Sequence, residues 1–299
     1  MSTPDVETPL EHAVPDRLDP AEAFAILGNE TRIHILQELW QATDRPVAFS
    51  DLRRRVGMRD SAQFNYHLGK LTDHFVKRTD DGYDFRYAGE KVVRAILAGT
   101  FTEHVSMELP VPDDCHDCDG DLVATYHDEQ LGIECESCDA TYGRYAFPPG
   151  GLKDRSTEEV LRAFDQRVRH LHCLAADGVC PECSGRVETT VRRDDEDLLG
   201  LDVRVDHECL QCRHVVTSPV GISLLDTSAV VAFFDEQGVN LGTTPHWTLP
   251  WCVRDDTTTV ACWDPVRVEV VVPGEDEQLR VTLDGDLTVV DTVREPLDA

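Results

Sequence analysis

Residues 60–75 read DSAQFNYHLGKLTDHF, and this stretch decides how the first third of the chain folds. Its apolar side chains Phe64, Leu68, Leu71 and Phe75 recur at the spacing of one face of an α-helix. The opposite face carries amide, phenol and amine groups and, in its central turns, no acidic residue. We therefore predict an amphipathic helix over residues 60–75, with its apolar face packed on the helices before it and its polar face open to a partner.

The segments around this helix form an ordered set of predicted elements. Helical spacing and capping residues predict helices at Asp19–Leu27, after the cap Asn29, and at Asp51–Val56 behind the cap Ser50. The hairpin predicted over residues 76–87 turns at an Asp-Asp-Gly sequence. A last helix is predicted at Gly89–Met107. This order, ending in helix, hairpin and helix, is what a winged helix-turn-helix needs to place one helix in a DNA major groove.

The motifs LGNETRIHILQEL (residues 27–39) and SAQFNYHLGKLTDHFVKR (residues 61–78) resemble those of ArsR-type winged-helix repressors. The resemblance covers about residues 19–107, which contain no cysteine of the kind many members of that family use to sense metals. It implies a transcriptional regulator, expected to be a repressor, that binds double-stranded DNA as a homodimer. The expected dimer helices are 19–27 and 89–107.

Candidate DNA contacts follow from the polar face of the helix and from the basic residues beside it. Gln63 and Tyr66 are expected to face base edges, since a glutamine amide pairs well with adenine, while the flanking Asn65 and His67 assist. Phosphate contacts are expected from the basic residues Arg59, Lys70, Lys77, Arg78 and Arg86.

The charge of the chain is strongly acidic but unevenly distributed. The formal net charge is −29, and only four of the 28 basic residues are lysines. Residues 20–100 hold 12 basic and 11 acidic side chains, whereas residues 101–299 hold 15 and 41. The acidic excess is therefore kept away from the predicted DNA-binding segment. Acidity with so few lysines resembles cytosolic proteins of halophilic archaea, where molar salt screens the self-repulsion.

Eight of the eleven cysteines form four C-x2-C pairs, and the pairs fall into two sets of two. Each pair can supply two thiolates to a tetrahedral metal ion, and strands on either side of each pair can bring two pairs together. The sequence therefore predicts two zinc ribbons, each holding one structural Zn²⁺. The predicted metal ligands are Cys115, Cys118, Cys135 and Cys138 in the first set, and Cys180, Cys183, Cys209 and Cys212 in the second.

Other roles for these cysteines are less favoured. Disulfides are rare in a cytosolic chain, and a thioredoxin-type redox pair needs a βαβ context that is not evident here. An iron–sulfur cluster remains an alternative for four thiolates. The nearby histidines are expected around the metal or at the surface rather than as ligands. Cys173, Cys252 and Cys262 have no such spacing and are expected to be free buried thiols; Cys252 and Cys262 could also face each other across a hairpin.

The fold class is predicted as α+β with several domains. A capping box at Ser156 predicts the helix Thr157–Leu174, and alternating apolar residues predict a set of strands after residue 246 that includes Trp247–Val253. The stretch VVAFFDEQGVN…HWTL resembles a recurrent C-terminal domain of haloarchaeal ArsR-like proteins. The predicted divisions are a tail (1–18), a winged helix (19–109), a first ribbon (110–150), a connecting helix (151–178), a second ribbon (179–218) and an α+β unit (219–299).

The favoured function is a sequence-specific, cytoplasmic, DNA-binding transcriptional regulator that is not an enzyme. A winged helix followed by a zinc ribbon also resembles the alpha subunit of the archaeal general transcription factor E, so a basal, polymerase-associated factor is the alternative. A zinc-dependent interaction module is a third possibility. The chain lacks G-x-S-x-G, H-E-x-x-H and phosphate-binding glycine motifs, and no run of apolar residues predicts a membrane span. No effector or protein partner can be assigned to the C-terminal region.

Overall fold

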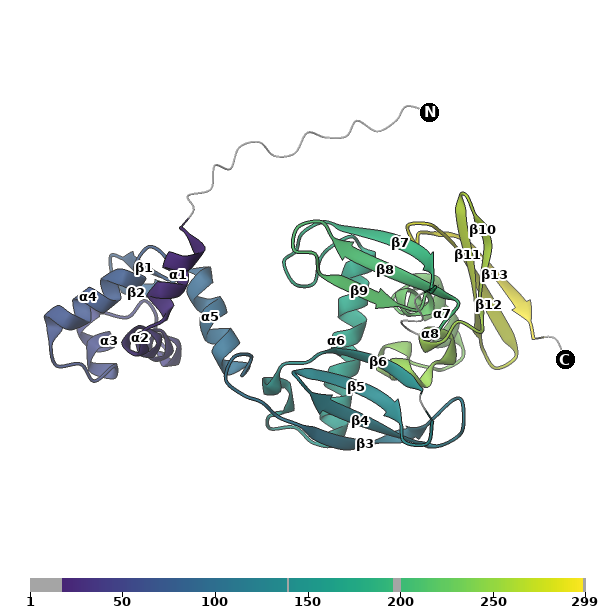
Figure 1. Ribbon diagram of the computed structural model, residues 1–299, viewed down its shortest axis with the longest axis horizontal. Helices are drawn as coiled ribbons and strands as arrows, with labels where there is room; N and C mark the ends of the chain where they lie inside the picture. The colour runs from purple at the N-terminus through teal and green to yellow at the C-terminus, as the bar shows by residue number, and fades with distance from the viewer. Residues whose placement is uncertain (1–17, 139, 196–199, 298–299) are drawn as a thin grey trace, which may run out of the picture. The chain divides into compact units, whose positions relative to one another are not determined.

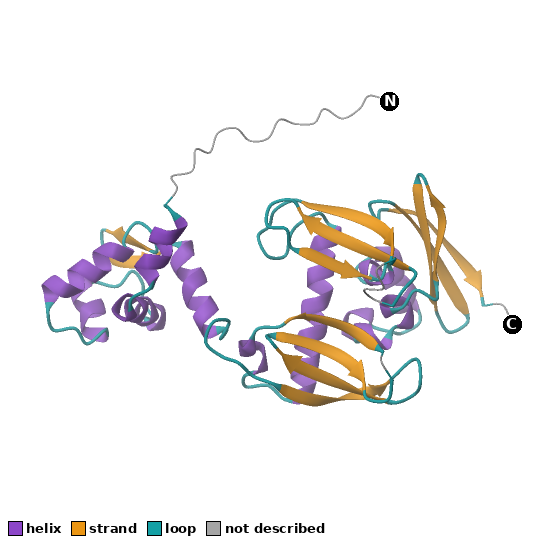
Figure 2. Ribbon diagram, viewed as in Figure 1, coloured by secondary structure: helices purple, strands orange, loops and turns teal. Residues whose placement is uncertain are grey.

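The computed structural model describes residues 18–138, 140–195 and 200–297. Nearly all of the predicted N-terminal tail lies outside these residues. Within them the fold is a mixed α+β structure with eight α-helices and four small antiparallel sheets (Figures 1 and 2). The chain divides into two compact units between Thr102 and Glu103.

The first unit contains five helices and one hairpin. Side-chain oxygens of Asp19, Asn29 and Asp60 accept hydrogen bonds from backbone N–H groups in the first turns of α1, α2 and α4, which is why these helices begin where they do. Its elements are α1 (Pro20–Leu27), α2 (Glu30–Gln41), α3 (Phe49–Arg55), α4 (Ser61–Leu71), β1 (Val76–Thr79), β2 (Gly82–Phe85) and α5 (Tyr87–Leu97).

The apolar face of α4 anchors the core of this unit. Phe64, Leu68 and Leu71 are buried in one cluster with apolar residues of α2, α3 and the hairpin. Val47, ahead of α3, exchanges two backbone hydrogen bonds with Tyr83 of β2, at 2.8 and 2.9 Å. The hairpin is therefore fixed to the helices by backbone pairing as well as by packing.

Three boundaries predicted in this unit were wrong. The helix predicted over 60–75 ends at Leu71, because Thr72 turns to extended backbone and Asp73 adopts a left-handed conformation; Phe75 is buried from the turn that follows. The helix predicted at Gly89–Met107 begins at Tyr87 and ends at Leu97. The third helix begins at Phe49, with no side-chain cap, instead of behind Ser50.

The second unit contains three sheets and three α-helices. The first sheet has the order β3-β4-β5-β6, the second β7-β8-β9, and the third β10-β11-β12-β13. The strands are β3 (Met107–Asp114), β4 (Asp121–His127), β5 (Gln130–Cys135), β6 (Thr141–Ala146), β7 (Val187–Arg193), β8 (Val203–Cys209), β9 (Val215–Ser218), β10 (Thr258–Trp263), β11 (Val266–Pro273), β12 (Glu277–Asp284) and β13 (Val289–Pro296). The helices are α6 (Thr157–Ala176), α7 (Ser228–Glu236) and α8 (Pro250–Val253).

Helix α6 organises this unit. The predicted capping box is present, with Ser156 and Glu159 each bonding to the other's backbone N–H. Phe164 and Val168 of α6 are fully buried in a cluster that includes residues of all three sheets, α7 and α8. The segments 110–150, 151–178, 179–218 and 219–299 thus contribute to one continuous core, with α6 lying between the first two sheets in Figure 1.

Near the C-terminus, the strand predicted at Trp247–Val253 was wrong. This segment forms a 3-10 turn, His246–Thr248, followed by the short helix α8, which starts with Pro250 at its first position. Strands β3, β6 and β9 were not predicted as strands. Three of the cysteine loops join these strands to their pairing partners, at 115–118 between β3 and β4, at 135–138 between β5 and β6, and at 209–212 between β8 and β9. Local alternation of residues does not reveal such pairing.

Candidate metal centres and nucleic-acid interface

All four C-x2-C pairs form the same backbone loop. In each, the N–H of the first cysteine donates a hydrogen bond to the carbonyl of the residue five positions later, at 2.8–3.0 Å. The residue after the second cysteine is left-handed at Asp119, Ser184 and Arg213; the fourth such position, 139, lies outside the described residues. Further backbone N–H groups point at the sulfurs, such as Asp117 to Cys115 Sγ at 3.4 Å. These bonds prearrange the thiolates for a cation.

The two sets of cysteines predicted as ligands are brought together as predicted. Within each set the four sulfurs lie within 4.8 Å of one another. In the first set the Sγ atoms of Cys115 and Cys138 are 3.7 Å apart, and those of Cys118 and Cys135 are 3.5 Å apart. The second set repeats these values, 3.7 Å for Cys180–Cys212 and 3.5 Å for Cys183–Cys209. A tetrahedron with metal–sulfur bonds of about 2.3 Å has edges of about 3.8 Å, so both groups are compatible with one metal ion each.

One thiol in each group is prepared to ionise near neutral pH. Burial opposes ionisation of Cys115, but hydrogen bonds from Tyr142 and from the backbone lower its pKa to about 7. Backbone N–H groups of Cys212 and Gln211 lower the pKa of Cys209 to about 6 against the effect of desolvation. A thiolate is the form that binds metal, so each group has a starting ligand.

The two groups differ in their surroundings. Around the first, Leu122, Ile133 and Tyr142 are buried in the large core shared with α6. Around the second, Cys180, Cys209 and Val187 form a small separate cluster, with Cys183 packed against it. The first group is therefore supported by apolar packing that the second group lacks.

The neighbouring histidines have partners of their own. The ring Nε2 of His116 lies 2.9 Å from the carbonyl oxygen of Trp247, and Nδ1 of His207 lies 2.9 Å from the Thr189 hydroxyl. Both rings thus hold other parts of the fold in place. Burial lowers the pKa of His207 to about 4, which keeps its ring neutral.

The other three cysteines do not share one environment. Cys252 is fully buried in α8, Cys173 is partly buried on α6, and Cys262 is exposed on β10. All are free thiols. The expectation that all three are buried was therefore wrong for Cys262, and Cys252 and Cys262 do not face each other across a hairpin, because α8 replaces the predicted strand.

The polar face of α4 is exposed. Gln63, Asn65 and Lys70 are solvent-accessible, Tyr66 is 58% exposed, and the Lys70 ammonium lies 5.9 Å from the Tyr66 ring centre. His67 is only partly exposed, and its ring packs edge-on against Tyr66. The face predicted to read DNA is therefore accessible in this unit.

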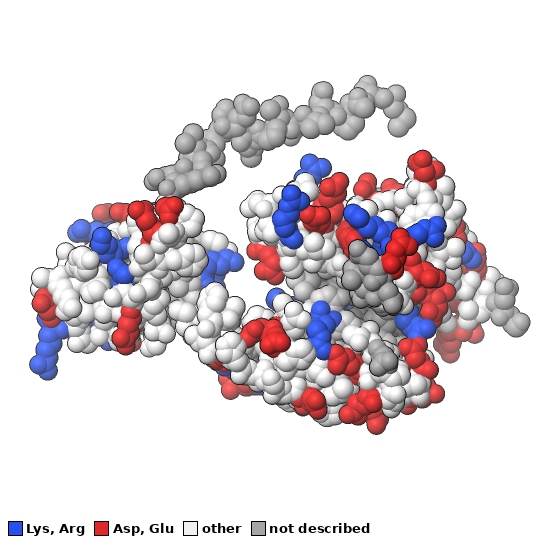
Figure 3. Space-filling view, viewed as in Figure 1, with Lys and Arg blue, Asp and Glu red and all other residues white. Residues whose placement is uncertain are grey.

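The five basic residues predicted to contact phosphates differ in whether their side chains already have partners within the unit. Lys77 forms an ion pair with Asp84 at 3.5 Å, and the Arg86 guanidinium donates to the backbone carbonyl of Asp73. Within the described residues, Arg59 and Arg78 are exposed and form no ion pair. Figure 3 shows basic side chains among acidic ones on the visible face of the first unit and many acidic side chains on that of the second.

A buried polar network in the second unit was not predicted. Asp165 of α6 accepts hydrogen bonds from the backbone N–H and Nδ1 of His246, at 2.8 and 2.9 Å, and from Arg169 Nε at 2.8 Å. Burial alone would raise the pKa of Asp165, but these two partners lower it. An aspartate within the apolar stripe of a helix, between Leu161 and Val168, is the sequence signal that could have revealed this network.

Two family models match the chain, each within one of the compact units. One, described as a domain of unknown function (DUF7351), matches residues 112–289, and another of the same description (DUF7347) matches residues 20–96. No curated protein and no solved structure matches the chain. Within the described residues, every helix is too short or too polar to cross a lipid bilayer.

Proposed function

The chain belongs to the family described as a domain of unknown function (DUF7351), and from its own residues we propose that it is a DNA-binding transcriptional regulator. In this proposal the first unit is a winged helix-turn-helix of the ArsR type, expected to act as a repressor. The second unit carries two structural zinc ions and is not an enzyme. The observation that carries the proposal is the exposed polar face of α4, held outward by a fully buried apolar face.

The order of elements supports this assignment. Helix α3, a short turn and α4 have the succession of a helix-turn-helix, and the hairpin β1–β2 follows as a wing. In a groove, Gln63 and Tyr66 would meet base edges while Arg59 and Lys70 hold phosphates. Since Lys77 and Arg86 already have partners within the unit, Arg78 is the wing residue best placed for the backbone.

Exposed apolar side chains on α1, on α5 and just after α5 support a homodimer. Phe24 and Phe101 are each 75% exposed, and Tyr87 and Leu97 of α5 are 67% and 54% exposed. Large apolar side chains at the two helices that the ArsR resemblance assigns to the dimer contact are what a second copy would bury.

The double variant Phe24→Ser/Leu97→Ser is therefore expected to convert the dimer to a monomer, because it removes apolar area that only the partner covers. Light scattering after size-exclusion chromatography measures the mass. Leu174→Ser is the matched control, since Leu174 is a 41% exposed leucine on α6. A double variant that stays dimeric would contradict this contact surface.

Zinc is proposed for both four-cysteine groups. Four thiolates complete a tetrahedral sphere and leave no open position for substrate, which is typical of structural zinc. The repeated loop with N–H groups directed at sulfur supports the same assignment.

Mapping of binding sites in cells, followed by footprinting with purified protein, tests the regulator proposal. A regulator should protect a defined operator alone. Protection that requires RNA polymerase would instead indicate a basal, polymerase-associated factor, and no protection under either condition would contradict both functions.

The acidic charge leads to a prediction about salt. A chain of net charge −29 approaching a polyanion needs its repulsion screened, so DNA affinity is expected to persist in molar KCl. Fluorescence anisotropy of a labelled operator across KCl concentrations measures this. Ordinary DNA-binding proteins lose affinity steeply with rising salt through counterion release. If this protein loses all measurable DNA affinity by about 0.5 M KCl while its fold stays intact, the interpretation as a halophilic protein is wrong.

A further inference from the structure

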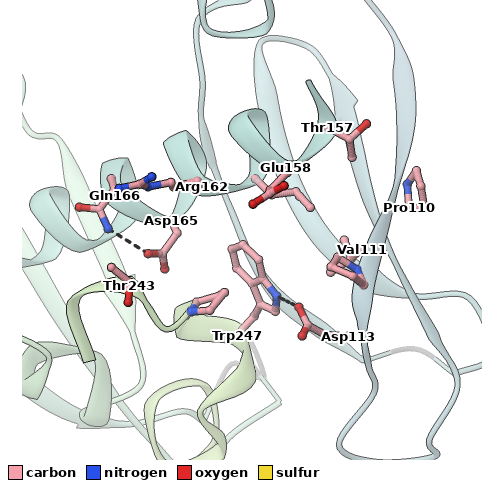
Figure 4. Close-up of a pocket in the computed structure, with 13 residues that line it drawn as sticks. Pro110, Val111, Asp113, Thr157, Glu158, Arg162, Asp165, Gln166, Thr243 and Trp247 are labelled. Atoms are coloured by element: carbon pink, nitrogen blue, oxygen red, sulfur yellow. Dashed lines mark hydrogen bonds between the residues drawn. The ribbon is translucent and has the colours of Figure 1, made fainter. Parts of the chain in front are cut away.

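A cavity of about 540 Å³ lies in the second unit, between β3, the first half of α6 and the segment 243–247 (Figure 4). This volume falls within the range of small-molecule sites in proteins. Val111 and Leu161 on its wall are buried, and the prolines at 110, 112 and 245 add apolar surface. The indole of Trp247 stands between α6 and the strand that carries Asp113 (Figure 4). The cavity is therefore built to receive an apolar body.

The polar groups around the cavity determine what charge it accepts. Asp113 Oδ2 accepts a hydrogen bond from Trp247 Nε1 at 2.9 Å, which leaves its other carboxylate oxygen available. Within the part of the chain that the structure describes, the side chains of Glu158 and Arg162 form no ion pair or hydrogen bond. Asp165 also lines the cavity, but both of its oxygens are engaged by His246, Arg169 and Gln166. Two available carboxylates thus face one available guanidinium.

We propose that this cavity binds a small organic cation, an aromatic or aliphatic body that carries an ammonium group. The apolar body lies against Val111, Leu161 and the indole, and the ammonium lies between Asp113 and Glu158. A carboxylate-lined site next to an indole suits an ammonium through both ion pairing and cation–π attraction. An anion of the same shape would be repelled by the two carboxylates, and this repulsion would exceed its attraction to Arg162.

The wall of the cavity is tied to the first four-cysteine group. His116, in the loop of Cys115, bonds to the carbonyl of Trp247, and its backbone N–H bonds to the Tyr142 hydroxyl at 2.9 Å. The same hydroxyl lies 3.2 Å from Cys115 Sγ. These contacts fix Trp247 and Asp113 in place before a ligand arrives, which lowers the cost of ordering the site on binding. The proposal does not depend on DNA binding.

The test compares tryptamine, a cation at neutral pH, with indole-3-propionate, an anion of similar shape. Binding to the full chain is measured by ligand-observed NMR. Tryptamine is expected to bind with a Kd of about 1 mM or tighter, given its size, and more tightly than indole-3-propionate. Asp113→Asn, which keeps an acceptor for the indole N–H, should weaken tryptamine about tenfold because Asp113 is half-buried. Glu158→Gln, at an exposed position, should weaken it about threefold.

Two further variants separate this site from general acidity. Arg162→Gln should strengthen tryptamine binding, since it removes the cation that competes with the ligand. Glu188→Gln, an exposed carboxylate of β7 away from the cavity, should leave the Kd unchanged. Equal or tighter binding of indole-3-propionate, an unchanged Kd in both Asp113→Asn and Glu158→Gln, or no saturation by tryptamine below about 10 mM would overturn the proposal.

Discussion

Cys209→Ser is expected to release one metal ion and unfold the loops around the second four-cysteine group, whereas Cys135→Ser releases one ion but leaves the first sheet folded. The difference follows from packing. Binding of a structural zinc supplies about 10–16 kcal/mol to folding in small peptides. Cys180, Cys209 and Val187 have only their own small cluster to replace it. The first sheet keeps the buried side chains that pack against α6, each contributing about 1.5–3 kcal/mol.

Elemental analysis and hydrogen exchange test this expectation. The wild-type chain should hold two zinc ions and each variant one. Exchange should rise around residues 180–188 and 208–216 in Cys209→Ser, since Val191, Val203 and Val205 remain in the large core, and only near the cysteine loops in Cys135→Ser. Cys262→Ser, at an exposed thiol outside both groups, is the matched control and should keep two ions. Equal unfolding in the two cysteine variants would contradict the role assigned to the core, and a metal-free wild type would end the zinc proposal.

Gln63→Ala/Tyr66→Ala is expected to weaken operator binding by about thirtyfold or more while the first unit stays folded. Both side chains are exposed on α4 and contribute nothing to its buried face, so stability should change little. Each base contact is worth about 1–3 kcal/mol, which makes the combined loss about 2 kcal/mol or more. Fluorescence anisotropy on the mapped operator measures the affinity, and circular dichroism reports the fold.

Gln41→Ala is the control for this double variant, because Gln41 is an exposed glutamine at the end of α2, away from the α4 face. It should bind the operator as the wild type does. If the double variant protects the same operator with unchanged affinity, α4 is not the reading surface and the helix-turn-helix proposal is wrong.

Local sequence signals correctly predicted the elements whose determinants lie within a few neighbouring residues. The caps at Asp19, Asn29 and Ser156 and the apolar spacing of α4 are contained within a few residues, and so is each C-x2-C loop. The members of both four-cysteine groups were predicted in full for the same reason, because pairs of such loops have few ways to complete a tetrahedral arrangement.

Features that depend on distant segments could not be predicted in this way. The segment 247–253 alternates like a strand, but its Trp247 and Trp251 are buried from a 3-10 turn and a short helix. An alternating pattern indicates which side chains are buried, but it does not show whether a strand, a turn or a helix carries them. The hydrogen bonds between Asp165 and His246 join residues 81 positions apart, so the apolar stripe of α6 marks Asp165 as unusual but no local pattern identifies its partner. The cavity beside α6 is likewise lined by three separate segments of the chain.

The continuous core of the second unit decides how this protein can be taken apart in the laboratory. An expression fragment that stops after β6 would carry Leu122 and Ile133 into water without α6 to cover them, and one that starts at residue 179 would lose Phe164 and Val168. Such pieces invite aggregation, and their failure would say nothing about the natural role of either metal group. A cut between Thr102 and Glu103 leaves both cores whole. Two fragments, rather than one for each recognisable motif, are the natural starting material for biochemistry.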